Sequence, residues 1–276
     1  LKQYIRRRAA VSLTAWRKLK HSGTVTVNGE PATGRTILHT GDVLHLVWHE
    51  ENHLTPTAAP LRILYEDEFL LIIDKPAGML VHPTASEEGT SVGNIITHYY
   101  QQKGLSIAFH PIHRLDRGTS GILAIAKVAH IQQILSAQNH QQMSRTYLAL
   151  VHGTLPPRGS ITTPIARKEG SIIERTVSED GQEAHTDYET LLTRDGLSLV
   201  RLTLHTGRTH QIRVHMASIG HPLIGDDLYG SSYHAFPRQA LHSAQLSFIH
   251  PITKQNIRIT SPLPIDMVNL LMCYTI

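Results

Sequence analysis

The amino-acid sequence predicts an α+β fold, built on a mixed, mainly antiparallel sheet with flanking helices and preceded by a small unit of two helices and a β-hairpin. Two observations predict it. Apolar residues alternate with a period of two in consecutive pairs of segments joined by short turn sequences, which is typical of antiparallel hairpins. Between these pairs lie segments whose apolar residues recur every three or four positions, which is typical of helices.

The small unit is expected within residues 1–54. Apolar periodicity over residues 1–23 indicates two helices, with Ser12 as the N-cap of the second helix and Gly23 at its end. Two alternating runs follow, and an Asn-Gly dipeptide at 28–29 ends the first of them, so we expect a hairpin. The two expected strands cover residues 24–27 and 43–47.

A linker and a larger domain are expected after this unit. Residues 55–61 carry two prolines and little periodicity, which indicates a linker, and the larger domain then covers residues 62–276. Its expected helices cover residues 90–102, capped by Thr90, residues 128–138, and residues 209–219, closed by Gly220. Its expected strands cover residues 61–65, 69–73, 122–126, 145–151, 184–193, 197–206, 241–249 and 255–260.

The composition is that of a globular protein. With 276 residues, 41% of them hydrophobic and 17% charged, the chain can bury a sizeable core. No apolar run approaches the roughly 20 residues of a membrane helix, and the basic start of the chain lacks the uncharged core of a secretory signal. The single cysteine, Cys273, has no partner for an internal disulfide. We therefore expect a cytoplasmic protein without a membrane anchor.

Positive charge is concentrated at the start of the chain. The net charge is +4, but the first 29 residues contain seven of the 26 Lys and Arg residues and no Asp or Glu. Such a concentrated positive field is typical of contact with a polyanion, most often a nucleic acid. A solvated basic face or a disordered tail would explain it equally well. The seven residues are Lys2, Arg6, Arg7, Arg8, Arg17, Lys18 and Lys20.

The densest polar motif is the segment 113–121, which comes directly before an expected strand. Asp116 lies between Arg114 and Arg117, and two facing cations would keep its carboxylate ionised and oriented. Such a group can act as a nucleophile or a general base. The alternative is an Asp that caps a turn, with both arginines in solvent. Ser120 lacks the Gly-x-Ser-x-Gly elbow, so a serine hydrolase is not predicted.

A second polar motif covers residues 207–215 at the start of an expected helix. Ile212, Met216 and Ile219 would share one face of that helix and anchor it to the core. Arg213 would lie at the border of this face, from which it can reach a carboxylate on another loop. Alternatively, Arg213 is a surface residue whose aliphatic stem covers apolar area.

No metal or nucleotide motif is recognisable. Although the chain has 20 histidines, it contains no His-Glu-x-x-His sequence, and the five-residue spacing of His205, His210 and His215 does not align ligands on one helix face. Glycine-rich phosphate-binding loops are also absent from the sequence. We therefore expect no metal and no nucleotide cofactor, although a metal site assembled from residues distant in the sequence stays open.

Five sequence blocks together resemble those of the RluA/RluD-type RNA pseudouridine synthases, in the order in which that family has them. Segment 113–121 resembles the loop around the family's catalytic aspartate, and the resemblance extends from about residue 62 to about residue 262. The first 50 residues resemble, more weakly, the small αL-type RNA-binding domain first seen in a ribosomal protein. The other four blocks cover residues 74–78 with 81–83, 145–153, 207–215 and 220–226.

The resemblance implies roles for individual residues. Asp116 would be the nucleophile, attacking either the uracil ring or the anomeric carbon of the ribose, and Tyr147 would stack on the target base. Arg213 would pair with Asp116, and Arg114 would fill the space that a flipped nucleotide leaves. Further substrate contacts would come from His113, Arg117 and Arg208, and RNA contacts in the N-terminal unit from Arg6, Arg7, Arg8, Arg17, Lys18 and Lys20.

The resemblance also implies a cofactor-free isomerase that acts as a monomer on RNA, on ribosomal RNA in preference to tRNA. One position departs from the family, because Gly118 stands where an acidic residue is common. This departure leaves open how the loop is stiffened and what Arg117 pairs with. Two other classes of function stay open beside the isomerase: a non-catalytic RNA-binding or ribosome-assembly protein, and a histidine-rich metal-dependent hydrolase.

Overall fold

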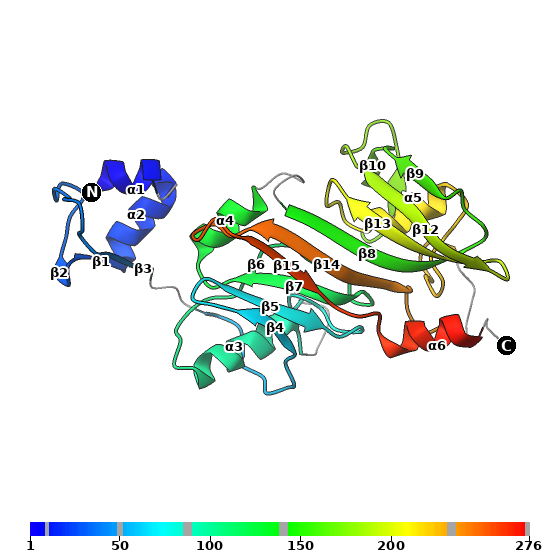
Figure 1. Ribbon diagram of the computed structural model, residues 1–276, viewed down its shortest axis with the longest axis horizontal. Helices are drawn as coiled ribbons and strands as arrows, with labels where there is room; N and C mark the ends of the chain where they lie inside the picture. The colour runs from blue at the N-terminus through cyan, green and yellow to red at the C-terminus, as the bar shows by residue number, and fades with distance from the viewer. Residues whose placement is uncertain (9–10, 49–51, 85–89, 138–142, 231–235, 274–276) are drawn as a thin grey trace.

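The structure is a computed structural model that describes residues 1–8, 11–48, 52–84, 90–137, 143–230 and 236–273 (Figure 1). Residues 1–48, here called the N-terminal unit, have a hydrophobic core of their own. Helices α1 (Lys2–Arg8) and α2 (Leu13–Ser22) pack against a three-stranded sheet of order β2-β1-β3. The core residues are Ile5, Val11, Trp16 and Leu19. The strands are β1 (Gly23–Val27), β2 (Glu30–Pro31) and β3 (Leu44–Trp48).

The two helices of the N-terminal unit agree with expectation, but an additional short strand, β2, lies between the two strands of the expected hairpin in the sequence. Ser12 caps α2 by accepting a hydrogen bond from the backbone N–H of Ala15 at 3.1 Å. The turn at 28–29 joins β1 to the short β2, whereas β3 pairs with the other edge of β1. Strand β2 ends at Pro31, which has no backbone N–H to donate, so the chain leaves the sheet before it returns as β3.

The segment that follows the N-terminal unit is bound along α3 (Val92–Gln102). The Asn52 amide donates hydrogen bonds to Thr97 Oγ1 at 3.0 Å and to the carbonyl of Ile107 at 3.1 Å. Five residues later, the N–H of Thr57 donates to the carbonyl of Asn94 at 3.1 Å. Residues 52–61 therefore form no regular element but are tethered to the larger part of the molecule.

A large mixed sheet forms the rest of the fold. Its order is β4-β5-β7-β14-β8-β13-β12-β9, with β15 paired to β14 and β6 paired to β7. Every pairing is antiparallel except that of β7 with β14, which confirms the mainly antiparallel prediction. The strands are β4 (Ile63–Glu66), β5 (Leu70–Lys75), β6 (His110–Pro111), β7 (Ser120–Ala126), β8 (Met143–His152), β9 (Arg158–Ile161), β12 (Thr186–Arg194), β13 (Leu197–Leu204), β14 (Leu241–Ile249) and β15 (Asn256–Thr260).

Helices cover both faces of this sheet. On β5, Leu71 and Ile73 share a hydrophobic cluster with α3 and with α5 (Gln211–Ser218). Leu70 and Ile72 point to the opposite face, where they pack with α4 (Ala129–Ser136). Helix α6 (Ile265–Cys273) packs on that second face too, through a third cluster that includes the β8 residue Leu150.

Several short elements were not expected from the sequence. Strands β10 (Ile165–Arg167) and β11 (Arg175–Val177) form a separate hairpin that contacts α5, and three residues are too few to show a period. Strand β9 and helix α6 were missed too. The N-cap of α3 is Ser91 and not Thr90, because Ser91 forms a reciprocal capping box with Asn94. No helix in the described part of the chain has the length and hydropathy needed to cross a membrane.

Candidate active site

Asp116 lies on the segment between β6 and β7, residues 112–119, here called the Asp116 loop. Lys75, at the end of β5, supports this loop from inside the protein. Its ammonium group is buried and donates to the carbonyls of Pro76 and Met79 at 2.8 Å and of Arg117 at 3.2 Å. Burial lowers the pKa of Lys75 to about 7, and the charge of Asp116 opposes this shift. The sequence analysis did not identify Lys75 as a site residue, although a lysine that ends a buried apolar strand is a usable signal.

Arg117 and Gly78 bind each other reciprocally at the same loop. The N–H of Gly78 donates to the carbonyl of Arg117 at 2.8 Å, and Arg117 Nε donates to the carbonyl of Gly78 at 3.1 Å. Gly118 has no side chain, and the space that one would occupy is filled by Gln239. A Cβ at position 118 would lie 2.2 Å from Oε1 of Gln239. The loop is therefore stiffened by Gln239 and by backbone hydrogen bonds in place of an acidic side chain.

A second buried cation, Arg238, holds the next carbonyl of the loop. Its Nη1 donates to the carbonyl of Gly118 at 2.9 Å. The other side of the guanidinium forms two hydrogen bonds with Asp266 of α6, at 2.7 and 3.0 Å. Helix α6 is thus connected to the Asp116 loop through one side chain, a connection that nothing in the sequence pattern indicates.

The end of the Asp116 loop depends on a glycine. Gly121 has a φ of +106°, and a Cβ on it would lie 2.3 Å from the carbonyl oxygen of Ser243 on β14. Only glycine allows β7 to begin this close to β14. Ser243 also pairs with Tyr147 of β8, so the close approach brings the Asp116 loop beside Tyr147.

Arg213 of α5 is paired with two carboxylates. Its Nε and Nη2 donate to Asp226 at 2.7 Å each, and Asp226 is fully buried. Its Nη1 lies 3.5 Å from Oδ2 of Asp116. Asp226 therefore fixes the guanidinium, which presents its remaining face to Asp116. Asp226 was missed as a site residue, although it belongs to the recognised block 220–226.

Arg213 reaches a carboxylate on another loop, as expected, but it does so from a buried position and not from the border of an anchoring face. Every residue from Gln211 to Met216 is buried, and Arg213 is only 6% exposed. Ile219, expected on the packed face, is 38% exposed because the helix ends at Ser218. A buried guanidinium is tolerated here because Asp226 neutralises it in a bidentate geometry.

Two connected hollows meet at Asp116. A large cleft of ≈ 1340 Å³ and a small pocket of ≈ 220 Å³ are both lined by Arg114, Asp116, His210 and Arg213. Arg117 lines only the large cleft. His113, Tyr147 and Arg208 line only the small pocket.

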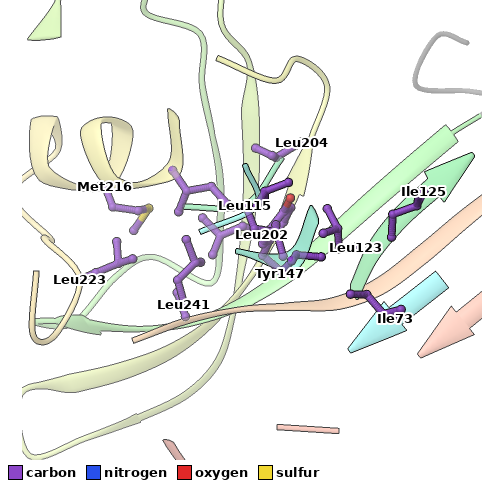
Figure 2. Packing of buried hydrophobic residues seen from close by; sticks show 14 of the residues in the cluster. Ile73, Leu115, Leu123, Ile125, Tyr147, Leu202, Leu204, Met216, Leu223 and Leu241 are labelled. Carbon is purple, nitrogen blue, oxygen red and sulfur yellow. The ribbon is translucent and has the colours of Figure 1, made fainter. Parts of the chain in front are cut away.

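Tyr147 forms part of the wall of the small pocket and part of the core. Figure 2 shows its ring among Leu115, Leu202 and Leu204, and only 4% of the residue is exposed. Burial raises the pKa of its hydroxyl, which forms a hydrogen bond with Ser243. The ring is therefore held rigidly, with its position set by the strand β8 on which it lies.

The other residues expected in the site differ in how firmly they are held. His113 Nε2 accepts a hydrogen bond from the N–H of Ala124 at 3.2 Å, and burial lowers the pKa of His113 to about 3, so the ring is neutral. Arg114 is exposed between the two hollows. Arg208 is also exposed, and its Nε donates to the carbonyl of Glu183 at 2.8 Å.

The basic residues of the N-terminal unit lie away from Asp116. Figure 1 shows α1 and α2 at one end of the molecule, beyond α4, whereas α5 lies towards the other end. The structure therefore does not bring them to the site. The side chain of Arg8 lies outside the described residues. The exposed lysine and arginine side chains described on these helices are those of Lys2, Arg6, Arg7, Arg17, Lys18 and Lys20.

His210 faces Asp116, although the sequence analysis did not single it out as a site residue. It precedes α5 with a left-handed φ of +58°. Its Nε2 lies 3.9 Å from Oδ1 of Asp116, and its Nδ1 lies 2.7 Å from the hydroxyl oxygen of Tyr229. Burial lowers the pKa of His210, and this favours the neutral imidazole. An uncommon backbone conformation beside a carboxylate makes His210 a candidate for a functional role.

One histidine cluster away from Asp116 has the composition of a metal site. His185, Asp187 and His205 place their ligand atoms within 4.8 Å of one another. Both imidazoles contact the same carboxylate through Nε2, at 3.0 and 2.6 Å, and their rings are stacked at 4.1 Å with an angle of 16°. A metal bound by both nitrogens must lie near both ring planes, and these nearly parallel planes do not converge. The arrangement fits two hydrogen-bonded imidazoles that share one carboxylate.

Comparison with known proteins relates this geometry to one family. A family model described as RNA pseudouridylate synthase matches residues 69–218. The chain is 44% identical over 254 residues to "Uncharacterized RNA pseudouridine synthase YjbO" of Bacillus subtilis, covering 90% of each protein. It is 35% identical over 279 residues to "Ribosomal large subunit pseudouridine synthase D" of Xanthomonas campestris pv. campestris, covering 94% of this chain and 82% of that protein.

A solved structure shows the same fold. "Human RNA Pseudouridylate Synthase Domain Containing 4" superposes with a TM-score of 0.61 at 24% sequence identity. The match covers 76% of this chain and 93% of the human one. The α+β prediction, with a mixed sheet and flanking helices, is thereby confirmed.

Proposed function

Because the chain belongs to the RNA pseudouridylate synthase family, we propose that it converts uridines of ribosomal RNA to pseudouridine with Asp116 as the nucleophile. It is an isomerase that acts on RNA. The observation that carries the proposal is the position of the Asp116 carboxylate, which lies where the large cleft meets the small pocket and 3.5 Å from the Arg213 guanidinium. The ribosomal substrate is supported by the names of relatives such as the Xanthomonas protein.

The chemistry of the reaction matches what these residues can supply. The bond between the ribose and N1 of uracil breaks, a bond from the same ribose carbon to C5 forms, the C5 proton leaves and N1 takes up a proton. The base therefore needs a pocket in which it can turn. A nucleophile is also needed, because it forms the covalent intermediate in which the base is detached or activated. Asp116 can add to C6 of uracil or to the anomeric carbon and is released again at the end. Since no group is gained and no electrons are transferred, we propose that no cofactor takes part.

The two hollows suit a flipped nucleotide. A base inside a helix is out of reach, so the target uridine must leave the stack. We assign the uracil to the small pocket, where Tyr147 provides an aromatic ring and His113 a neutral imidazole. The large cleft would hold the surrounding RNA. Arg114 is exposed between the two hollows and is suited to fill the space that the base leaves. Arg117 and Arg208 are also exposed and are suited to contact phosphates.

We also propose a division of labour along the chain. Residues 1–54 would form an αL-type RNA-binding domain, residues 55–61 a linker, and residues 62–276 the catalytic domain. The separate hydrophobic core of the N-terminal unit and its exposed cationic side chains support this division. One chain supplies Asp116, Tyr147 and Arg213, which supports a monomeric enzyme, and a ribosomal substrate would place it in the cytoplasm.

The test is tritium release from transcripts labelled at C5 of uridine. Wild-type protein and Asp116→Asn are incubated with ribosomal RNA and tRNA transcripts, and RNA binding is measured in parallel. We expect the wild type to release tritium from ribosomal RNA and the variant to release none while still binding. Release from tRNA alone would overturn the ribosomal substrate. Release by the variant would overturn the role of Asp116, and binding without any release would leave a non-catalytic RNA-binding protein.

A further inference from the structure

The hydrogen bonds around Tyr229 determine where the proton of His210 lies. The Tyr229 hydroxyl oxygen accepts from the backbone N–H of Arg175 at 2.9 Å. Its single proton then needs an acceptor, and among the described residues Nδ1 of His210, at 2.7 Å, is the one in hydrogen-bond range. When Nδ1 accepts, the proton of a neutral imidazole must be on Nε2.

The Nε2–H of His210 is directed at the reacting region. Nε2 lies 3.9 Å from Oδ1 of Asp116, while Arg213 approaches the other carboxylate oxygen, Oδ2. The 3.9 Å separation is longer than a hydrogen bond, but such contacts commonly shorten when substrate binds. His210 also lines both hollows, so its proton is available on either side of Asp116.

From this geometry we infer that His210 is a positioning residue for Asp116. As a neutral donor whose tautomer is set by Tyr229, it orients the carboxylate from the side opposite Arg213. The inference rests on the proposed role of Asp116 as nucleophile. It also gives the β10–β11 hairpin a function, because the backbone of β11 fixes Tyr229 through Arg175.

Burial favours the neutral form of His210 over an imidazolium. Burial has the largest effect on its pKa and lowers it. Two carboxylates near the ring raise the pKa of His210, and two guanidiniums lower it. These four groups are Asp116, Asp226, Arg213 and Arg175.

The test compares His210→Asn and Tyr229→Phe with the wild type. Asparagine tolerates a left-handed φ and keeps a polar atom near the Tyr229 hydroxyl, but places nothing at the position of Nε2. We expect kcat for tritium release to fall about 10- to 100-fold in His210→Asn, which is the range for losing a hydrogen bond to a charged group. The KM for RNA and the Tm should stay at their wild-type values.

Tyr229→Phe gives a signature that a merely structural role would not produce. Without the hydroxyl, His210 at neutral pH can carry its proton on either nitrogen, so part of the population loses the Nε2 donor. At lower pH the imidazolium has a proton on both nitrogens, and the donor returns. We therefore expect the kcat of Tyr229→Phe, relative to wild type, to recover as the pH falls below the pKa of His210, which burial places below its ordinary value of 6.5.

The double variant decides whether the two residues act as one unit. In Tyr229→Phe/His210→Asn, we expect no recovery at low pH and no loss beyond that of His210→Asn alone. Wild-type kcat in His210→Asn, or additive losses that are the same at every pH, would overturn the inference. The same assay run on wild type and Asp116→Asn reports on the proposed function separately. An inactive wild type or an active Asp116→Asn would overturn that proposal instead.

Discussion

At the scale of single residues, the side chains around Asp116 divide into two groups by what they bind. Lys75 and Arg238 hold backbone carbonyls of the Asp116 loop. Arg213 and His210 face the carboxylate itself. The first group sets the position of the backbone and the second the orientation of the side chain, so substitutions in the two groups should affect different steps.

His113 provides a pH-dependent contribution to stability. Its pKa is about 3 in the folded protein and near 6.5 in an unfolded chain, so the unfolded chain binds the extra proton between these values. Stability is therefore complete above pH 6.5 and falls as the pH drops towards 3, by up to about 1.4 kcal/mol per pH unit. In His113→Gln, the amide oxygen can accept the hydrogen bond from the N–H of Ala124, and it does not titrate. The part of the pH dependence of the free energy of unfolding that comes from His113 should therefore disappear.

Denaturant unfolding between pH 3 and 8 measures this contribution. The matched control is His45→Gln, which replaces an exposed histidine on β3 of the N-terminal unit and is measured in the same way. Identical slopes for His113→Gln and wild type would show that His113 titrates alike in both states.

At the scale of elements, helix α6 takes part in the site although it contributes no residue to the reaction. Asp266 of α6 orients Arg238, which binds the carbonyl of Gly118. Lysine cannot form the two parallel bonds to Asp266 and reach the loop at the same time. We expect Arg238→Lys to lower kcat about 10- to 100-fold, since displacing the nucleophile by about 1 Å has effects of that size.

Steady-state kinetics with labelled RNA test this connection. Arg258→Lys serves as the control, because Arg258 is an exposed arginine on β15 that bonds to Gln245. Unchanged kcat in Arg238→Lys would mean that the Asp116 loop keeps its place without the guanidinium. A raised KM with unchanged kcat would mean that Arg238 contributes to RNA binding and does not position the Asp116 loop.

The sequence predicted some elements well and others poorly, for physical reasons. Strand β7 is buried along its whole length, and its apolar run was recognised at once. The hairpin of β12 and β13 agrees with the consecutive strands expected at 184–193 and 197–206. By contrast, β10 and β11 are three residues each, and Ile165 of β10 is stabilised by a tertiary contact with Val214 and Tyr229 that no local pattern shows.

The site was predicted in part. The residue blocks indicated Asp116 and Arg213. The pairing of Arg213 with Asp226 depends on how the loop after α5 folds back onto that helix, and the spacing of residues in the sequence does not predict it. The same is true of His210, whose role depends on a hydroxyl 19 residues away. Partners distant in sequence are set by topology, and the local sequence does not show them.

At the scale of the whole molecule, two separated surfaces are suited to RNA. The exposed cations of α1 and α2 lie at one end, and the large cleft beside Asp116 lies nearer the other (Figure 1). If both contact the same RNA, binding should depend strongly on salt. We expect Arg6, Arg7 and Arg17, replaced together by Gln, to reduce the slope of log K against log salt by about 2 to 3.

Filter binding at several salt concentrations measures this slope. The control replaces three exposed arginines on the large sheet, Arg158, Arg194 and Arg201, by Gln. An unchanged slope for the N-terminal variant would remove α1 and α2 from the RNA interface. Equal changes in both variants would indicate a general effect of net charge and not a binding surface.

The bond between Arg238 and the carbonyl of Gly118 joins residues 120 positions apart. A ribosome makes proteins from the N-terminus, so the cationic helices α1 and α2 emerge before the Asp116 loop, and Arg238 and α6 emerge long after it. If these cations bind RNA and Asp116 is the nucleophile, as proposed, a nascent chain presents its RNA-binding charges before its nucleophile is in place. On that proposal, we expect catalytic competence to require translation of the chain beyond Arg238 and α6.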